Sequence, residues 1–561
     1  MKTKFLLATL VLSLCFLSSI QAQDCDCDHV IDPTTPFVKG ENFDIQPGDR
    51  ICLMAGEYDY LHILNFHGEP GNPITFVNCG GKVTVGQFRH HFGFVMENCQ
   101  YFRLTGTGDE NINYGILVDG TTNRASGMSI STFSTDFEVD HVEFANTGGA
   151  GFHMVMRPSC DPATHRANFT QRNIFIHDNY AHDNGAEGFY MGHSFYNGQD
   201  IQCDGQTVTV FPMLIDNIRF YNNITERTGQ DGFQVSTAES GAEIYNNVVR
   251  DYGLNEIPAQ AAGIVVGGGT SGRIYNNWIE NGFAGGIHVF GIGDVTIFNN
   301  VIKDAGESGI FIGDKTTLPG RPFQVINNTI IEPAQKGIDM NSDISSDNVI
   351  YNNIIINPGA LSDFITNPLR AYINFKNQAV DADTTKNHFN SAIANVAFEN
   401  ANSKIFHLLE NSPAANNGVD VSDYGITFDF NFFPRGQSGS FSAGAFEFGT
   451  ERTGIVTSIE DDIIESNSVL DLRIFPNPVR SNGTLKAEIT LKQNQNISLE
   501  LVDIQGRLVS KIIENEFLSQ GQHSFEIPLK DHLDTSGATG VYLLSIETGD
   551  DRIVRQVNIF R

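Results

Sequence analysis

The chain has 561 residues, of which 35 are Lys or Arg and 66 are Asp or Glu, so its formal net charge is −31. A hydrophobic content of 40%, including 42 Phe, is enough to build a core and excludes general disorder. The acidic balance argues against nucleic acid or an anionic membrane as partner, because either requires a basic surface. The length favours several modules or a repeat array over one compact domain.

Residues 1–22 have the features of a secretory signal peptide. Lys2 and Lys4 form a basic start, residues 5–16 are almost wholly apolar, and Ala22 provides a small residue before a cleavage site at Gln23. A membrane anchor is disfavoured because the apolar run is too short to span a bilayer comfortably, and no other segment is as long. We therefore expect an exported protein with no transmembrane segment in its mature chain.

Seven cysteines remain after removal of this leader, and all lie in the first half of the chain. Export permits disulfides, and the cysteine spacings match no zinc-binding pattern. The short motif Cys25-Asp26-Cys27 is weak evidence for a metal when it stands alone. Structural disulfides are therefore the favoured interpretation, and the odd number leaves one thiol that is either free or intermolecular.

A repeat built on Asn-Asn pairs runs through the middle of the chain. Each pair lies between an aromatic or aliphatic residue and an apolar or β-branched one, and the six pairs begin at Asn222, Asn246, Asn276, Asn299, Asn327 and Asn352. These starts are 24, 30, 23, 28 and 25 residues apart, a period typical of a solenoid. The alternating β-type runs between them exclude helical repeats.

A second motif runs in phase with the first and consists of Gly, an apolar residue, any residue and another apolar residue. It begins at Gly188, Gly232, Gly263, Gly286 and Gly309. Alternation places the two apolar side chains inside and the residue between them outside. We predict coils of short strands joined by turns, in which Asn adopts left-handed backbone geometry and stacks on the Asn of the next coil. The fold class is therefore all-β, with a parallel β-helix.

The two ends of this region resemble a known family. The segments IQPGDRICL at 45–53, GEY at 56–58 and PITF at 73–76 resemble the first coils of secreted β-helix polysaccharide lyases and their uncharacterised relatives. The segments SPA at 412–414 and GAFE at 444–447 resemble the closing part of such helices. The resemblance implies a right-handed β-helix over residues 23–449. It does not specify the reaction, because this scaffold carries lyases, glycosidases, esterases and binding proteins.

The composition changes after this region, and residues 450–470 have the character of a linker. Residues 471–561 resemble the C-terminal sorting domain of cargo of the Bacteroidetes type IX secretion system, through IFPNP at 474–478, LVDIQGR at 501–507 and GVYLL at 540–544. Strands broken by Pro and Gly turns predict a small antiparallel β-sandwich. An ordinary carbohydrate-binding sandwich is the alternative. The resemblance implies recognition by the type IX machinery and release from, or attachment to, the outer cell surface.

The middle residue of each Gly-initiated strand should face outward, so these residues predict one column along the solenoid. The column contains, in chain order, His153, Tyr190, Gln234, Val265, His288, Phe311 and Asp339. Its spacings of 37, 44, 31, 23, 23 and 28 residues make the early coils longer than the later ones. The excess length must leave the solenoid as loops.

Two of these loops, residues 157–173 and 192–217, follow the same strand in adjacent coils. Cys160 and Cys203 fall at matching places within them, which predicts a disulfide between the loops. Long loops on a rigid scaffold are where functional sites are usually built. We therefore place a cleft over the three column residues nearest to these loops, His153, Tyr190 and Gln234.

The residues around this cleft suit β-elimination on a uronate-containing polysaccharide. That reaction needs a cation to neutralise the sugar carboxylate, a base for the C5 proton and an acid for the leaving oxygen. His153 and Tyr190, on adjacent coils, are the candidates for these proton transfers, and Arg157 or Arg166 is the candidate cation. Because the chain is acidic overall, local arginine or a bound Ca²⁺ would be needed to hold a polyanion. No metal ligands are assigned.

Hydrolysis is the competing chemistry, with Glu187 and Asp231 as the catalytic pair. Each acid immediately precedes the strand Gly, so the two should lie on neighbouring coils about 4.8 Å apart. That separation is near the one retaining glycosidases use, and mutual repulsion would raise one pKa, leaving one acid and one base. Hydrogen bonding of both acids to turn amides is the non-catalytic alternative.

The candidate substrate-binding residues are Gln234, His193, Arg166 and His288. For His288, which lies in a short coil, a surface histidine without function is the alternative. Neither catalytic arrangement matches a lyase or polygalacturonase motif, so the resemblance assigns no catalytic residue. We expect a secreted enzyme that cleaves a polysaccharide, with a lyase ahead of a hydrolase. The second hypothesis is a non-catalytic surface protein that binds glycan or mediates adhesion.

Overall fold

The computed structural model describes residues 25–86, 92–109, 111–364, 366–436, 439–449, 469–475, 479–480, 483–503, 508–533, 540–548 and 552–560. The predicted leader lies outside these residues, as does the predicted linker up to residue 468. Parts of two sorting-domain motifs, at 476–478 and 504–507, also lie outside them. Within the described residues, no helix has the length and apolar character needed to cross a bilayer.

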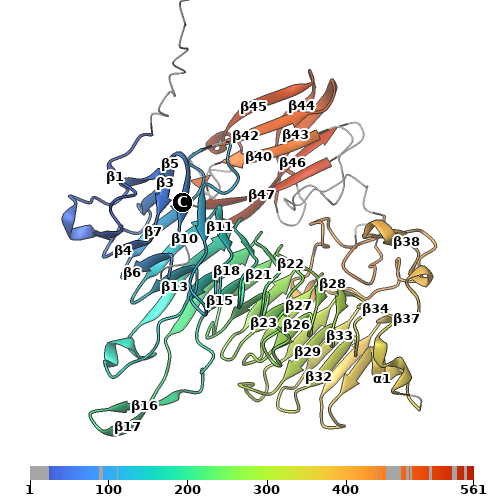
Figure 1. Cartoon of the computed structure of the whole chain (residues 1–561). Helices are drawn as coiled ribbons and strands as arrows, with labels where there is room; N and C mark the ends of the chain where they lie inside the picture. Colours follow the sequence, from blue (N-terminus) through green and yellow to red (C-terminus); the bar gives the residue numbers. More distant parts are fainter. Residues whose placement is uncertain are drawn as a thin grey trace, which may run out of the picture.

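Residues 29–390 form a parallel β-helix in which short strands of successive coils stack in register (Figure 1). One face is a twelve-stranded parallel sheet, with the strands β2 (Phe37–Lys39), β4 (Leu61–Leu64), β6 (Phe94–Glu97), β9 (Met128–Ser131), β12 (Phe152–Met154), β15 (Phe189–Met191), β20 (Phe233–Val235), β23 (Ile264–Val266), β26 (Ile287–Val289), β29 (Ile310–Gly313), β32 (Ile338–Asn341) and β35 (Ile373–Phe375). This sheet carries the predicted outward column.

The other faces belong to one 23-stranded sheet that consists of two ladders. The first ladder contains β1 (His29–Ile31), β3 (Arg50–Tyr58), β5 (Ile74–Val85), β7 (Gln100–Thr105), β10 (Thr135–Asp140), β13 (Thr170–His177), β18 (Leu214–Tyr221), β21 (Ala242–Tyr245), β24 (Gly272–Tyr275), β27 (Val295–Phe298), β30 (Phe323–Ile326), β33 (Asn348–Tyr351) and β36 (Ala382–Thr385). The second contains β8 (Ile116–Asp119), β11 (Val142–Ala145), β14 (Tyr180–His182), β19 (Ile224–Glu226), β22 (Val248–Arg250), β25 (Trp278–Gly282), β28 (Val301–Ala305), β31 (Thr329–Ile331), β34 (Ile354–Ile356) and β37 (His388–Asn390). The long strand β5 joins the two ladders, because it pairs with both β7 and β8.

The Asn-Asn repeat forms the turns between these two ladders. The first Asn of each pair has a φ between 53° and 55°, which is the left-handed geometry that Asn tolerates better than most residues. The second Asn of each pair is part of a side-chain amide ladder with N–O distances of 2.9–3.2 Å, running through Asn179, Asn223, Asn247, Asn277, Asn300, Asn328, Asn353 and Asn387. The ladder satisfies buried amides and aligns successive coils, as the repeat predicted.

Two disulfides hold the first coils, Cys25–Cys79 and Cys27–Cys52. A third, Cys160–Cys203, joins the two long loops. Cys99, which is left over from these three disulfides, is a buried free cysteine. Burial raises the pKa of the Cys99 thiol to about 12, so this side chain is a neutral part of the core at physiological pH.

The segment from residue 393 to residue 448 covers the outer side of the late coils. It includes the short strands β38 (Phe398–Asn400) and β39 (Ile405–Leu408). The short helix α1 (Leu369–Tyr372) precedes the segment in the chain. Its aromatic residues pack on Trp278, with ring centroids 5.7 Å apart for Phe406. Asn299 and Asn276 each donate a side-chain hydrogen bond to its backbone carbonyls, at 2.8 and 3.0 Å. The segment thereby hides apolar surface that the ladder would otherwise expose.

The C-terminal region has two sheets of its own. One contains β40 (Val469–Phe475), β42 (Thr484–Leu491) and β45 (Gly521–Pro528), and the other contains β41 (Val479–Arg480), β47 (Arg552–Phe560), β46 (Gly540–Thr548), β43 (Gln495–Asp503) and β44 (Leu508–Leu518). The pairings are antiparallel except for β41 with β47. A separate hydrophobic core that includes Leu499, Leu544 and Ile489 holds this small all-β module together.

Candidate functional site

The predicted outward column exists in the twelve-stranded sheet. Each of its members is the register partner of the next, from β12 through β15, β20, β23, β26 and β29 to β32. The imidazole of His153 and the ring of Tyr190 lie nearly parallel, with centroids 5.5 Å apart. The coil register therefore brings together two side chains that are 37 residues apart in the sequence.

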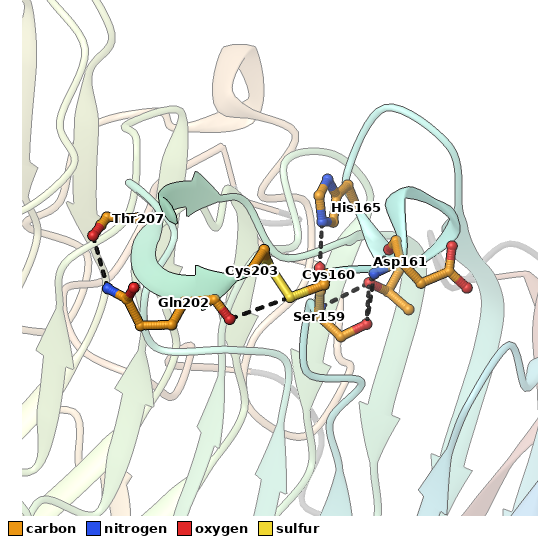
Figure 2. Close-up of a disulfide and its surroundings, with 8 residues drawn as sticks. Ser159, Cys160, Asp161, His165, Gln202, Cys203 and Thr207 are labelled. Carbon is orange, nitrogen blue, oxygen red and sulfur yellow. Dashed lines mark hydrogen bonds between the residues drawn. A yellow bond between two sulfur atoms is a disulfide. The ribbon is translucent and has the colours of Figure 1, made fainter. Parts of the chain in front are cut away.

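The two long loops leave this sheet directly after β12 and β15 and are joined by the Cys160–Cys203 disulfide, with Cα atoms 5.6 Å apart. Figure 2 shows the disulfide between them, with Gln202 on one side and Ser159 and Asp161 on the other. The second loop contains the hairpin of β16 (Gln199–Cys203) and β17 (Gln206–Val210), which projects from the stack of coils (Figure 1). A covalent bond thus holds the walls of the site at a fixed separation.

Arg166 provides a second connection between the loops. Its Nη2 donates to the carbonyl oxygen of Tyr196 at 2.6 Å, and its Nε donates to that of Pro212 at 3.2 Å. The guanidinium also lies over the Tyr196 ring, 4.2 Å from the centroid. These contacts give Arg166 a role in holding the walls, so Arg157, which is exposed at the start of the first loop, is the better candidate for contact with substrate.

His153 is a half-buried imidazole next to positive charge. Burial, and then Arg157 and His193, lower its pKa to about 4. Its Nδ1 is buried and has no hydrogen-bond partner among the described residues. His153 is therefore neutral at pH 7. Because Nδ1 is buried, proton exchange with a ligand would have to use the other ring nitrogen, Nε2.

His193 stands beside this pair at the start of the second loop. The backbone N–H of Phe195 donates to His193 Nδ1 at 3.1 Å, which leaves Nε2 as the protonated nitrogen of the neutral ring. Burial lowers the pKa of His193 to about 4, with a smaller contribution from Arg157. In the predicted cluster, Arg157 thus lowers the pKa of both His153 and His193, and His193 also lowers that of His153.

Ser194 links two column residues and was not predicted from the sequence. Its Oγ lies 2.6 Å from the Tyr190 hydroxyl and accepts a hydrogen bond from Gln234 Nε2 at 3.2 Å. Gln234, a predicted substrate-binding residue, is buried, and its side-chain amide is already hydrogen-bonded to Ser194. Ser194 gave no sequence signal, because only the folding-back of the loop after β15 places it over the column.

Glu187 and Asp231 occupy register-equivalent positions on adjacent coils, two residues before the first residues of β15 and β20. The same position in the coil of β26 is Gly285, where a Cβ would lie 2.3 Å from Nε2 of the column residue His288. In the coil of β32 it is Lys336, whose Nζ contacts the column residue Asp339. Side chains at this position in those two coils are thus directed toward the column.

The two carboxyl groups are buried, with relative exposures of 7% for Glu187 and 3% for Asp231. Burial raises the pKa of Glu187 to about 7. Burial and then the charge of Glu187 raise the pKa of Asp231 to about 8. Asp231 Oδ1 also accepts a hydrogen bond from the Ala262 amide at 2.7 Å, which is the turn contact considered as the alternative role. At neutral pH the pair retains at least one proton that it can donate.

His288 lies three coils beyond Tyr190, about 14 Å away along the axis, so it is not part of this cluster. Its neighbours are Phe311, at 5.3 Å between ring centroids, and Glu307, at 3.8 Å from its Nε2. The structure therefore separates one predicted substrate-binding residue from the others.

Two clusters of potential metal ligands occur among the described residues. One consists of Cys27, Cys52 and Cys79, all of which form disulfides. The other consists of Glu138, Asp140 and His177, and there Arg103 already provides the positive charge, with its Nε 2.7 Å from Asp140 Oδ2. Both clusters lie outside the twelve-stranded sheet, so neither supplies ligands to the candidate site.

Comparisons with known proteins agree with this architecture. Residues 201–355 match the family model of the right-handed β-helix region, and residues 473–559 match that of the secretion system C-terminal sorting domain. The protein therefore combines a right-handed β-helix with a type IX sorting domain, and is secreted or attached to the outer cell surface. No curated protein matches the chain.

Three solved structures illustrate the similarity at low identity. The chain is 14% identical to pectate lyase Pel9A, with a TM-score of 0.47, over 76% of this chain and 98% of that one. It is 12% identical to an alginate lyase from Paenibacillus sp. str. FPU-7, with a TM-score of 0.36, over 65% and 99%. A mutant of the periplasmic alginate epimerase AlgG is 11% identical, with a TM-score of 0.35, over 63% and 83%.

Proposed function

We propose that the surface over β12, β15 and β20, beside the two disulfide-joined loops, binds an acidic polysaccharide and cleaves it by β-elimination. The observation that carries this proposal is the neutral, half-buried His153, stacked on Tyr190 and next to the cation Arg157. These three groups are a base, a proton donor and a charge that can neutralise a sugar carboxylate.

The proposed step follows from these positions. Arg157 binds the carboxylate of the uronate, which makes the C5–H bond more acidic. His153 removes the C5 proton, the electron pair of that bond forms a C4=C5 double bond, and the C4–O bond breaks. The Tyr190 hydroxyl gives its proton to the leaving oxygen, and solvent then restores the protonation states of both residues.

The electrostatics of the free site are suited to an anionic ligand. Burial and Arg157 keep the pKa of His153 at about 4, which secures its unprotonated form before substrate binds. A bound carboxylate would bring negative charge close to the imidazole and raise its pKa toward the operating pH. The substrate would thereby strengthen the base that acts on it.

A hydrolase is the second candidate function, and the adjacent carboxyl groups Glu187 and Asp231 are the observation that favours it. Their raised pKa values allow one carboxyl to act as a proton donor at neutral pH while the other acts as nucleophile or base. One carboxyl oxygen of Asp231 accepts a hydrogen bond from a turn amide, so only its other oxygen is available for catalysis.

Product analysis separates these functions. The full chain is incubated with pectate, alginate and a neutral xylan, and products are followed by near-ultraviolet absorbance and by reducing-end formation. We expect unsaturated products from an acidic polysaccharide, and their loss in Tyr190→Phe. Saturated reducing ends that disappear in Glu187→Gln or Asp231→Asn would support the hydrolase instead. Saturable binding without any product would identify a glycan-binding protein and overturn both enzymatic proposals.

A further inference from the structure

A recess lies on the same twelve-stranded sheet, at the late coils. It is a cavity of about 450 Å³ lined by Phe290, Phe311, Asp314, Lys315, Asn341 and Lys376. Phe311 belongs to the outward column, four coils beyond Tyr190 and about 19 Å away along the axis. The cavity therefore continues the surface that carries the candidate cleavage site.

The cavity is formed at the carboxyl ends of the strands. Asn341 ends β32, Lys376 directly follows β35, and Asp314 and Lys315 directly follow β29. The two long loops of the early coils leave from this same edge, after β12 and β15. One extended ligand running along this edge can thus contact the loop-walled cluster and the cavity together.

Two phenylalanine rings form the apolar wall. The Phe290 and Phe311 centroids are 5.9 Å apart, and both rings are half-exposed. Gly313 keeps the space beside them open, since a Cβ there would lie 2.9 Å from a ring carbon of Phe311. An aromatic wall of this kind, with a few polar groups around it, is typical of a pocket that binds a small ring.

The polar groups include one lysine that suits an acidic sugar. The Lys315 ammonium lies over the Phe290 ring, 5.6 Å from its centroid. The Lys376 ammonium lies 3.4 Å from Asp343 Oδ2, and the Asp343 amide donates to Asp314 Oδ2 at 2.9 Å. Lys315 can thus pair with a ligand carboxylate, while Lys376 would share its charge between that carboxylate and Asp343.

We propose that this cavity is a binding subsite for a carboxylate-bearing sugar unit of the same polysaccharide chain that is cleaved over His153 and Tyr190. The proposal rests on the proposed function for the identity of the ligand, but not for the existence of the subsite. The four-coil separation implies that a substrate must be long enough to reach both places. Chain length should therefore affect binding through the cavity lysines.

Calorimetric titration of the full chain carrying His153→Ala tests the subsite without cleavage. The probes are oligogalacturonate and oligomannuronate of eight residues, with a neutral xylo-oligosaccharide of equal length as the comparison. We expect an acidic octamer to bind, the neutral one to bind much more weakly, and Lys315→Ala with Lys376→Ala to weaken acidic binding by roughly tenfold. Lys303→Ala, on β28 of the other sheet, is the matched control and should leave the affinity unchanged.

Equal affinity in the double lysine variant and in Lys303→Ala would overturn the subsite, as would the failure of both acidic octamers to bind. Phe311→Leu removes an aromatic ring from the cavity wall without altering the core, because this side chain faces outward, and it should also weaken binding. Activity of the wild-type chain is measured in parallel, so that the two proposals can fail separately. Binding that depends on the lysines, without any product, would support the subsite and contradict the proposed cleavage. Cleavage together with binding that does not depend on the lysines would support the cleavage and contradict the subsite.

Discussion

The early and late coils of the twelve-stranded sheet present the same strand position in different surroundings. Around β12 and β15, His153 and Tyr190 lie beneath two disulfide-joined loops. Around β32 the connections are shorter, and Asp339 is fully engaged by Lys336 at 2.9 Å and Asn374 at 2.8 Å. The comparison teaches that the coils supply register, whereas the loops supply the burial that makes a side chain reactive.

The largest effect should come from the imidazole beneath the loops. We expect His153→Ala to lower kcat on the polysaccharide that is cleaved by about 10²- to 10⁴-fold, the range for loss of a proton-transfer group. His388→Ala is the matched control, since burial also lowers the pKa of His388, on β37 of the other sheet. Initial rates of the two variants at pH 7 provide the test, and equal rates would remove His153 from the mechanism.

The next effect should come from the loop disulfide. Replacing Cys160 and Cys203 by Ser should reduce activity by about ten- to a hundredfold, because the loop walls lose their fixed separation. The melting temperature should fall as well, because this disulfide closes a stretch of 43 residues and so restricts the unfolded chain. Replacing Cys27 and Cys52 by Ser should also lower the melting temperature, but it should preserve activity at 25 °C. Equal losses of activity at 25 °C in the two variants would contradict the division between scaffold and loops.

The Asn ladder tests the scaffold directly. Asn300→Ala removes side-chain hydrogen bonds to Asn277 and Asn328 and leaves buried groups unpaired, so we expect a loss of about 1–3 kcal/mol in the free energy of unfolding. Asn387→Ala should cost less, because in the ladder that residue contacts only Asn353. Chemical denaturation of both variants measures the difference. A kcat altered at 25 °C by either variant would show that the ladder and the site are coupled.

The last test concerns the two buried acids. The pKa of Asp231 is about 8 in the folded chain and that of Glu187 about 7, both above the values of the unfolded chain. Their contribution to stability is therefore complete below about pH 4 and is lost as the pH rises toward 8. Asp231→Asn should make the decline of stability shallower by up to about 1.4 kcal/mol per pH unit. Unfolding measured from pH 4 to pH 8 checks this, and an unchanged slope would contradict the burial of an ionisable Asp231.

Much of the fold could be predicted because the signals are local and repeated. An Asn-Asn pair in each coil identifies the turn, and the Gly-initiated strand fixes which residue faces outward. The alignment of His153 with Tyr190 and of Glu187 with Asp231 followed from those two motifs alone. The matching places of Cys160 and Cys203 in their loops likewise predicted their disulfide.

What the loops do could not be predicted in the same way, because their paths depend on contacts between distant segments. Ser194 binds Tyr190 and Gln234 only because the chain folds back after β15. Arg166 was a candidate for substrate binding, yet two loop carbonyls occupy its guanidinium. The cavity beside Phe311 likewise combines residues from four coils that no sequence motif connects.

A crystal structure of the His153→Ala chain with a bound acidic oligosaccharide tests the central claim most directly. We expect the sugar to lie across β12, β15 and β20, with its carboxylate at Arg157, the leaving oxygen near the Tyr190 hydroxyl and the C5 hydrogen facing position 153. A sugar bound away from these strands, or bound there with its carboxylate directed away from Arg157, would contradict the account.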